Sequence, residues 1–281
     1  MPERVLAVLG HGVVPVDTPV LRADDLGALR GDGIFESMHV RAGRPWLLDE
    51  HLARMARSAE RLALALPPRT ALVELAEQAL AGWDPAVEGA LRLVCTRGPE
   101  GSGAVTVFAM VSPIGAGQLR GRREGVAVLT APLGYPVAVR AGAPWLLGGA
   151  KTLSYAVNMA SLRWAEEQGA DDVLWLSTEG YALEAPTATL VWLDGDTLWT
   201  VPPEQTGILP GTTARWLLDH ADALGRTAGE KLVRPAELGA AQGVWLVSSI
   251  RGAAEVRSLD GVVRKPSAET GALLDLLGFA G

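Results

Sequence analysis

Lysine is rare in this sequence, and one lysine lies where a neutral amine would be useful. The chain has 281 residues but only three lysines, Lys151, Lys231 and Lys265, whereas arginine is plentiful. A lysine amine in a dry site can lose its charge and attack a carbonyl carbon, whereas arginine keeps its proton at any usable pH. Lys151 follows the apolar, glycine-rich stretch 143–149, a poor setting for a solvated charge. It is our first candidate for covalent chemistry, and a solvated lysine at a strand end is the alternative.

Four other features have the chemistry to bind an anionic molecule that carries a carbonyl group. The stretch 210–213, Pro-Gly-Thr-Thr, opens a predicted helix, where free N–H groups, the helix dipole and two hydroxyls favour an anion. Arg54 lies on the polar flank of another predicted helix and can contact a phosphate as a fork. Ser248 and Ser249 end a predicted strand and offer hydroxyl donors. Glu184 lies inside an apolar strand and needs a partner if it is buried, such as a protonated heterocyclic nitrogen.

Each of these features also has an ordinary structural explanation. Thr212 or Thr213 can simply cap the helix. Arg54 can be a surface cation, serines end many strands, and Glu184 can face water from an edge strand. None of the features is therefore specific when taken alone. The four histidines show no ligand spacing and Cys95 is the single cysteine, so we expect no metal site.

The elements that must position these residues are predicted from the apolar periodicity and the turn signals. In the first part of the chain we predict strands at 34–40, 91–98 and 104–110, and helices at 49–66 and 71–81. In the second part we predict strands at 126–130, 172–177, 181–192, 197–200 and 244–248, and helices after Lys151, from 212 to about 224, and at 273–277.

A change of composition predicts the domain boundary. Residues 115–125 are rich in glycine and charge, which is typical of linkers. We predict a small N-terminal α/β domain over residues 1–115, a linker over 116–123, and a larger strand-rich domain over 124–281 that carries Lys151.

The composition is that of a soluble globular protein, with 48% hydrophobic and 20% charged residues. A net charge of -7 argues against a nucleic-acid partner. A single cysteine allows no internal disulfide and favours a cytoplasmic location. The apolar run after the first residues is too short for a signal peptide, and no stretch approaches the length of a membrane span, so we expect no membrane partner.

Five stretches, taken together and in this order, resemble the class IV aminotransferases, which are the fold-type IV pyridoxal-phosphate enzymes. They are residues 31–36, 51–55, 151–155, 179–187 and 207–213. The family contains branched-chain and D-amino-acid aminotransferases and aminodeoxychorismate lyases. The resemblance implies a two-domain α/β fold with a barrel-like larger domain, pyridoxal 5′-phosphate as cofactor, a small carboxylate-bearing substrate and a homodimer.

The resemblance also implies roles for individual residues. Lys151 would bind the cofactor as a Schiff base and move protons, and Glu184 would keep the pyridine nitrogen protonated. The other residues implied to bind the cofactor are Arg54, Tyr155, Thr187 through its backbone, Thr212, Thr213 and Ser249. Ala185 replaces the family's glycine after the glutamate, which is tolerable unless its φ angle is positive.

The lyase branch of the family is the closer resemblance. Residues 184–189 resemble the Pro-Thr form found in many aminodeoxychorismate lyases, and so do residues 247–252. The Arg-x-His signature of D-amino-acid aminotransferases is missing after Arg97. Glu36 argues the other way, because it belongs to a Phe-Glu pair that aminotransferases share, where some lyases have threonine. We therefore expect an aminodeoxychorismate lyase that forms 4-aminobenzoate and pyruvate on the folate route. A branched-chain or D-amino-acid aminotransferase is the first alternative, and a catalytically idle homologue is the second.

The substrate is a dicarboxylate if the lyase interpretation holds, so cationic and polar residues near the implied site are candidates to bind it. These candidates are Glu36, Arg97, Ser248, Ile250 and Arg251. Either arginine can equally be a surface cation.

Overall fold

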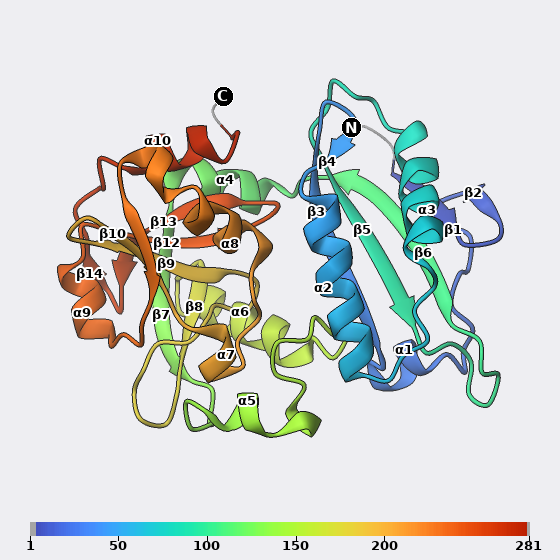
Figure 1. The fold of residues 1–281 in the computed structure, drawn as a ribbon, viewed down its shortest axis with the longest axis horizontal. Coiled ribbons are helices and arrows are strands. Elements are labelled where there is room, and N and C mark those ends of the chain that lie inside the picture. The colour runs from blue at the N-terminus through green and yellow to red at the C-terminus, as the bar shows by residue number, and fades with distance from the viewer. Residues whose placement is uncertain (1–3, 280–281) are drawn as a thin grey trace. The chain divides into compact units, whose positions relative to one another are not determined.

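The structure is a computed structural model that describes residues 4–279. Contacts divide the chain into two compact units (Figure 1). Unit 1 comprises Met1–Gly115 and Ala150–Tyr155, and unit 2 comprises Ala116–Gly149 and Ala156–Gly281. Each unit contains a sheet and helices, as the predicted α/β class requires. Among residues 4–279, no helix is long and apolar enough to cross a membrane.

Unit 1 is built on a six-stranded antiparallel sheet in the order β2-β1-β6-β5-β3-β4. Its strands are β1 (Val5–Val8), β2 (Gly12–Val14), β3 (Gly33–Arg41), β4 (Arg44–Pro45), β5 (Gly89–Thr96) and β6 (Thr106–Pro113). Its helices are α1 (Leu26–Arg30), α2 (Leu48–Arg61) and α3 (Arg69–Ala81).

Helices α2 and α3 pack on one face of this sheet (Figure 1). The apolar stripe of α2, which includes Leu52 and Met55, is buried in the same core cluster as Ile34 and Met38 of β3. Alternate residues of a strand point to opposite faces. Glu36 therefore lies on the face that α2 covers, whereas its neighbour on β3, Phe35, lies on the opposite face.

Unit 2 is built on an eight-stranded mixed sheet in the order β11-β10-β9-β12-β13-β7-β8, with β14 paired to β13. Its strands are β7 (Val126–Pro132), β8 (Asp172–Leu176), β9 (Thr189–Asp194), β10 (Thr197–Thr200), β11 (Thr227–Glu230), β12 (Gly243–Ser248), β13 (Gly252–Leu259) and β14 (Val262–Val263). Its helices are α4 (Ala116–Glu124), α5 (Val139–Gly142), α6 (Ala156–Glu167), α7 (Pro203–Thr206), α8 (Thr212–Asp219), α9 (Pro235–Ala240) and α10 (Thr270–Leu276), with 3-10 turns η1 (Pro144–Leu146) and η2 (Ala221–Leu224). The core of this unit lies around Leu190 and Trp192 of β9 and Leu246 of β12.

Two expectations about the domains differ from the structure. Residues 116–123, expected to be a linker, lie within helix α4 of unit 2. Tertiary contacts outweigh the low helix propensity of glycine there, because Gly121 is buried and Arg122 donates to the backbone carbonyls of Ile250 and Arg251. The segment Ala150–Tyr155, expected in the larger domain, packs with unit 1 because it pairs with the start of β3.

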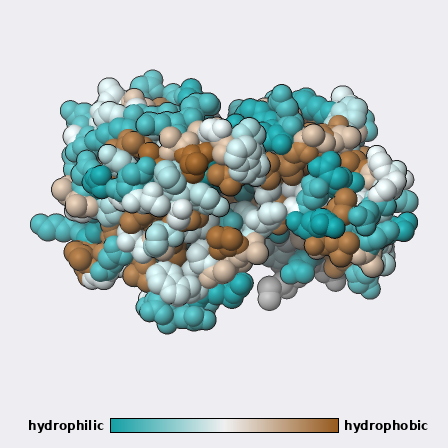
Figure 2. Space-filling view, turned by 90° about the horizontal axis from the view of Figure 1, so that it is seen from below, coloured by the Kyte–Doolittle hydropathy of each residue, from teal (hydrophilic) through white to brown (hydrophobic). Residues whose placement is uncertain are grey.

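The predicted strand over residues 181–192 is also wrong in its first half. Residues 181–188 make isolated bridges, such as Leu176 to Ala182, and the regular strand β9 begins at Thr189. Trp164 is 40% exposed on α6, whereas Trp175 is buried on β8. On the face shown in Figure 2, hydrophobic residues lie in several groups among hydrophilic ones.

Candidate active site

The backbone of Lys151 is held on both sides within unit 1. Its N–H donates to the hydroxyl of Ser58 over 3.1 Å, and its carbonyl accepts from the N–H of Phe35 over 3.1 Å. The next residues continue the pairing, since Thr152 bridges Ile34. Lys151 is thus attached to an edge of β3 and to helix α2. These backbone contacts fix the position of the Lys151 Cα relative to the sheet.

The Lys151 side chain lies among aromatic rings. Its Nζ is 4.4 Å from the ring centroid of Phe35 and 5.5 Å from that of Tyr155. The two rings meet edge to face, with centroids 5.3 Å apart. Aromatic faces attract a cation and also keep water away from a neutral amine. Tyr155, predicted near the cofactor, therefore lies in the same cluster as Lys151.

A buried polar cluster of Glu36, His51 and Arg54 occupies the face of β3 that α2 covers. Arg54 binds the Glu36 carboxylate with two N–H groups, each over 2.7 Å, and Nδ1 of His51 lies 2.6 Å from Oε2 of the same carboxylate. Glu36 and His51 are fully buried and Arg54 is 4% exposed. Ser58, one helical turn after Arg54, donates to its carbonyl over 3.0 Å. One face of α2 thus connects Glu36, through Arg54 and Ser58, to the backbone of Lys151.

The charges in this cluster follow from burial and contacts. Burial alone would raise the pKa of the Glu36 carboxyl, but the Arg54 guanidinium and the hydrogen bonds from Arg54 and His51 lower that pKa from 4.5 to about 2. Burial lowers the pKa of His51 from 6.5, because its contacts with Glu36 do not offset desolvation. An ionised carboxylate can only accept, so Nδ1 of neutral His51 carries the proton and donates to Glu36.

Arg97, predicted as a partner of the substrate carboxylate, is engaged by residues of unit 1. It forms a bidentate pair with Asp32, with distances of 2.6 and 3.0 Å. Its remaining N–H groups donate to the carbonyls of Leu62 and Ala63 over 2.7 and 3.1 Å. These contacts tie the start of β3 to the turn after α2. They give the substrate-binding prediction for Arg97 no support.

In unit 2, Glu184 is held at both carboxylate oxygens. Nη1 of Arg140 donates to Oε1 over 3.0 Å, and the backbone N–H of Leu209 donates to Oε2 over 3.0 Å. Glu184 is 8% exposed. A carboxylate offers about four acceptor sites, so two donors leave capacity for a further N–H. The backbone of the next residue, Ala185, does not have a positive φ angle, as the replacement of glycine requires.

Three hydroxyls gather at the N-terminus of α8, a few residues after Leu209. The Ser249 hydroxyl lies 3.1 Å from that of Thr213 and 3.4 Å from that of Thr212, and all three residues are buried. The helix is preceded by Gly211, which provides no side-chain cap. A Cβ on Gly211 would lie 2.2 Å from the hydroxyl of Thr189, so a glycine is required there. The three hydroxyls thus lie at the start of a helix, where the helix dipole favours an anion.

The other predicted residues of unit 2 lie beside this cluster in the sequence. Thr187 is exposed, and Asn158 donates to the preceding carbonyl of Pro186 over 2.7 Å. Ser248 accepts from the N–H of Arg251 over 3.4 Å within the β12–β13 turn. Ile250 is 8% exposed in that turn.

Arg251, the second predicted partner of the substrate carboxylate, is buried. Its Nη1 donates to Asp172 over 2.9 Å, which ties the β12–β13 turn to the start of β8. Its Nε and Nη2 have no hydrogen-bond partner among the described residues. The charge of Arg251 is therefore neutralised within the unit, although its guanidinium retains two donors.

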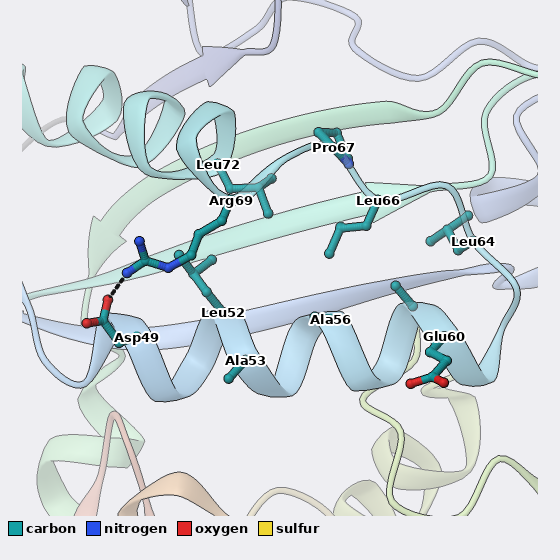
Figure 3. Close-up of a pocket in the computed structure, with 11 residues that line it drawn as sticks. Asp49, Leu52, Ala53, Ala56, Glu60, Leu64, Leu66, Pro67, Arg69 and Leu72 are labelled. Atoms are coloured by element: carbon teal, nitrogen blue, oxygen red, sulfur yellow. Dashed lines mark hydrogen bonds and ion pairs between the residues drawn. The ribbon is translucent and has the colours of Figure 1, made fainter.

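A pocket of about 470 Å³ in unit 1 is separate from all the predicted residues (Figure 3). It is lined by Asp49, Leu52, Ala53, Ala56, Ala59, Glu60, Leu64, Leu66, Pro67, Arg69 and Leu72. At about 100° per residue, the α2 members of this set lie on the side of the helix opposite to Arg54 and Ser58. The pocket therefore contributes nothing to the candidate site.

The candidate residues of unit 1 and those of unit 2 have the functional groups that are needed to bind pyridoxal phosphate. Unit 1 provides a lysine amine beside aromatic rings, and unit 2 provides a buried carboxylate with spare acceptor capacity and a hydroxyl cluster for an anion. The sequence predicted these groups but missed their supports. His51 and Ser58 were visible as helix neighbours of Arg54, whereas nothing in the sequence singled out Arg140, which contacts Glu184 across 44 positions.

The sequence matches the family model described as Amino-transferase class IV over residues 33–259. The chain is 45% identical to a bifunctional aminodeoxychorismate lyase and D-amino acid transaminase of Mycobacterium tuberculosis, over 94% of this chain and 95% of that protein. Its fold is similar to that of a PLP-bound hypothetical aminotransferase from M. tuberculosis, with a TM-score of 0.94, 41% identity and coverage of 99% and 98%.

A fold IV transaminase from Curtobacterium pusillum is also similar, with a TM-score of 0.91 and 35% identity over 98% of this chain and 97% of that one. The family match covers more than half of the chain, and it agrees with the arrangement of strands and helices in both units. The chain belongs to the class IV aminotransferase family of pyridoxal-phosphate enzymes, which includes aminotransferases and aminodeoxychorismate lyases.

Proposed function

We propose that the protein is an aminodeoxychorismate lyase that also transaminates D-amino acids, with Lys151 as its catalytic residue. The choice between reactions rests on the relative of 45% identity, whose name carries both activities. The lack of an Arg-x-His signature after Arg97 makes the lyase the leading activity. The two arginines considered for substrate binding are paired with Asp32 and Asp172, and this does not favour either reaction.

The chemistry of the two sets supports the cofactor roles that the family resemblance implies. Lys151 binds the aldehyde carbon, Glu184 accepts from the ring nitrogen, and the hydroxyls of Thr212, Thr213 and Ser249 bind the phosphate. Arg54 adds a positive charge for the phosphate, and the backbone at Thr187 adds a donor. Glu36 is fully buried and bound by Arg54, so it orients Arg54 and does not contact substrate.

Bound pyridoxal phosphate supplies an electron sink that stabilises a carbanion next to the substrate nitrogen. The lysine performs the proton transfers. In the lyase reaction the Lys151 amine removes the proton from the ring carbon that carries nitrogen. The C–O bond to the enolpyruvyl group then breaks and the ring becomes aromatic, and the leaving enolpyruvate takes up a proton to become pyruvate. In transamination the same amine moves the α-proton of the amino acid. The rings of Phe35 and Tyr155 shield part of this amine from water, since Lys151 is half-buried beside them.

The lyase activity is tested by product formation. Purified protein is supplied with pyridoxal phosphate, chorismate and the enzyme that aminates chorismate, and 4-aminobenzoate is measured. We expect 4-aminobenzoate from the wild type and none from Lys151→Ala. Absence of 4-aminobenzoate from a cofactor-loaded wild type rules out the lyase.

The transaminase activity is tested by a half-reaction without any 2-oxo acid. A transaminase given D-alanine alone loses the visible absorbance of its bound cofactor, because the amino group stays on the cofactor. A dedicated lyase keeps that absorbance. We expect the loss with D-alanine, and L-alanine serves as the stereochemical control.

We also propose that the protein is a homodimer. Helix α6 buries only Ala165, whereas Val157 and Trp164, two turns apart on one face of the helix, are 62% and 40% exposed. A second copy of the chain that packs on this apolar face would remove it from water. Light scattering should give twice the mass of 29.5 kDa, and Trp164→Glu should shift the mass towards one chain. A wild type with the mass of a single chain contradicts the proposal.

A further inference from the structure

Arg140 binds Glu184 from a part of the chain that none of the family-like stretches includes. It lies on α5, a four-residue turn, and Nη1 donates to Oε1 of Glu184 over 3.0 Å. The side chains of Arg140 and Glu184 are 19% and 10% exposed, so both charges are largely removed from water. The second oxygen of Glu184 is bound by the N–H of Leu209. Arg140 is therefore the one charged group that contacts Glu184 among the described residues.

The backbone of Arg140 is fixed by two glycines. A Cβ on Gly207 would lie 2.7 Å from the carbonyl carbon of Arg140 and 2.8 Å from its Cβ. A Cβ on Gly148 would lie 2.3 Å from the carbonyl oxygen of Arg140. The two glycine segments are joined, because the N–H of Gly149 donates to the carbonyl of Gly207 over 3.0 Å. The close packing sets the position of Arg140 independently of its ion pair.

The same loop connects this contact to the anion site. Gly207 packs on Arg140, Leu209 binds Glu184, and Thr212 begins α8. Gly207, which supports Arg140, is thus only five positions before Thr212 in the hydroxyl cluster. The carboxylate of Glu184 is held between a cation on α5 and a backbone donor of the loop that leads to the anion site. This arrangement fixes both the direction and the countercharge of the carboxylate.

We propose that Arg140 is a positioning residue that orients Glu184 and balances its charge, so that the free acceptor sites of Glu184 meet the ring nitrogen of the cofactor. This inference rests on the proposed role of Glu184. A charged Arg140 is always available, because guanidinium groups keep their proton in proteins. Without it, a buried carboxylate with one backbone donor would turn towards other donors and hold the cofactor less well.

The test measures the affinity for pyridoxal phosphate by titrating apo-protein and following the absorbance of the bound cofactor. We expect Arg140→Gln to raise the dissociation constant roughly 10-fold and to change the absorbance spectrum of the bound form. Arg140→Lys should recover most of the affinity, because it restores the charge. In a Glu184→Gln background, Arg140→Gln should have little further effect, since Arg140 acts through Glu184.

Arg226 offers a matched control within unit 2. It is 23% exposed, compared with 19% for Arg140, and it also pairs with carboxylates, Asp196 and Glu269. Arg226→Gln should lower the melting temperature without changing the affinity or the spectrum. The proposal is overturned if Arg140→Gln binds the cofactor like the wild type, if Arg226→Gln weakens binding equally, or if Arg140→Gln and Glu184→Gln add independently. A wild type that binds no pyridoxal phosphate contradicts the proposed function instead.

Discussion

Two buried glutamates, one in each unit, show how surroundings separate a structural carboxylate from a functional one. Glu36 in unit 1 is fully buried and receives three short hydrogen bonds, two from Arg54 and one from His51. Glu184 in unit 2 is 8% exposed and receives two bonds of 3.0 Å, from Arg140 and the N–H of Leu209.

The two carboxylates differ in how many acceptor sites remain free for a ligand. Glu36 has used most of its acceptor sites and cannot be reached by a ligand. Glu184 keeps free acceptor sites and is partly open to solvent. From the sequence, Glu184 was expected to contact the ring nitrogen of the cofactor, and Glu36 was expected to be a candidate for binding the substrate. The contacts give Glu36 a role in holding Arg54 and α2, and they leave Glu184 with acceptor sites for its proposed contact with the ring nitrogen of the cofactor.

Removing the charge of Glu36 should have the largest effect on stability. In Glu36→Gln, the buried Arg54 loses its countercharge, and breaking a buried ion pair in this way costs about 3–5 kcal/mol. The free energy of unfolding from urea titration measures the loss. A change below about 1 kcal/mol would mean that the cluster is not structural.

Glu184→Gln should act mainly on activity. We expect kcat to fall by about 10²-fold, the usual effect of removing one preorganised electrostatic contact, because the amide no longer keeps the ring nitrogen protonated. The free energy of unfolding should fall by only about 1–2 kcal/mol, since the Arg140 side chain is 19% exposed and is therefore less deeply buried than that of Arg54, at 5%. Steady-state rates at saturating cofactor provide the measurement. Wild-type rates in Glu184→Gln would reverse the roles assigned to the two glutamates.

Gly207→Ala should disturb the support of Glu184 without touching the carboxylate. Gly207 has a φ of 67°, and a Cβ there would meet Arg140. We expect a loss of about 1–3 kcal/mol in the free energy of unfolding together with weaker cofactor binding. Gly239→Ala in α9 is the control, because a Cβ there meets nothing within 4 Å. Equal effects of the two substitutions would show that the Arg140 turn is not tightly packed.

His51 should make unit 1 sensitive to acid by a smaller amount. The folded state lowers the pKa of His51 from 6.5, so the unfolded chain binds a proton first as the pH falls. Stability is therefore fully present above pH 6.5 and declines below it, by at most about 1.4 kcal/mol per pH unit for one proton. Urea midpoints between pH 7.5 and 5 should fall less steeply in His51→Gln. Parallel slopes would exclude His51 as the source.

Glu36 should extend this acid sensitivity to lower pH. Its pKa falls from 4.5 to about 2 on folding, so its contribution is present above pH 4.5 and is lost as the pH approaches 2. The same urea series, continued below pH 4.5 with Glu36→Gln, separates the two groups.

Local patterns predicted much of the fold. The apolar stripe of α2, the Asp194-Gly195 turn between β9 and β10, and the helix after Thr212 all follow from short-range periodicity or turn chemistry. The predicted end of α2 at residue 66 was less accurate. The helix ends at Arg61, several residues before Pro67 and Pro68, and Ala63 adopts a φ of 46°.

Contacts between distant residues could not be predicted in the same way. The stretch 116–123 lies in a helix that buries Gly121 and whose Arg122 donates to carbonyls 128 and 129 positions away. Arg97 pairs with Asp32 and Arg251 pairs with Asp172, and both pairs join residues that are more than 60 positions apart. Lys151, Glu184 and the hydroxyls were found from residue type and order, whereas Arg140 became visible only through its distance to Glu184.

The covalent site is tested most directly by reductive trapping. Protein loaded with pyridoxal phosphate is treated with borohydride, digested and mapped by mass spectrometry. We expect the visible absorbance to disappear and the cofactor to be found on Lys151, with Lys231 and Lys265 unmodified. Label on either of those two lysines, or no label on a protein that binds the cofactor, would contradict it.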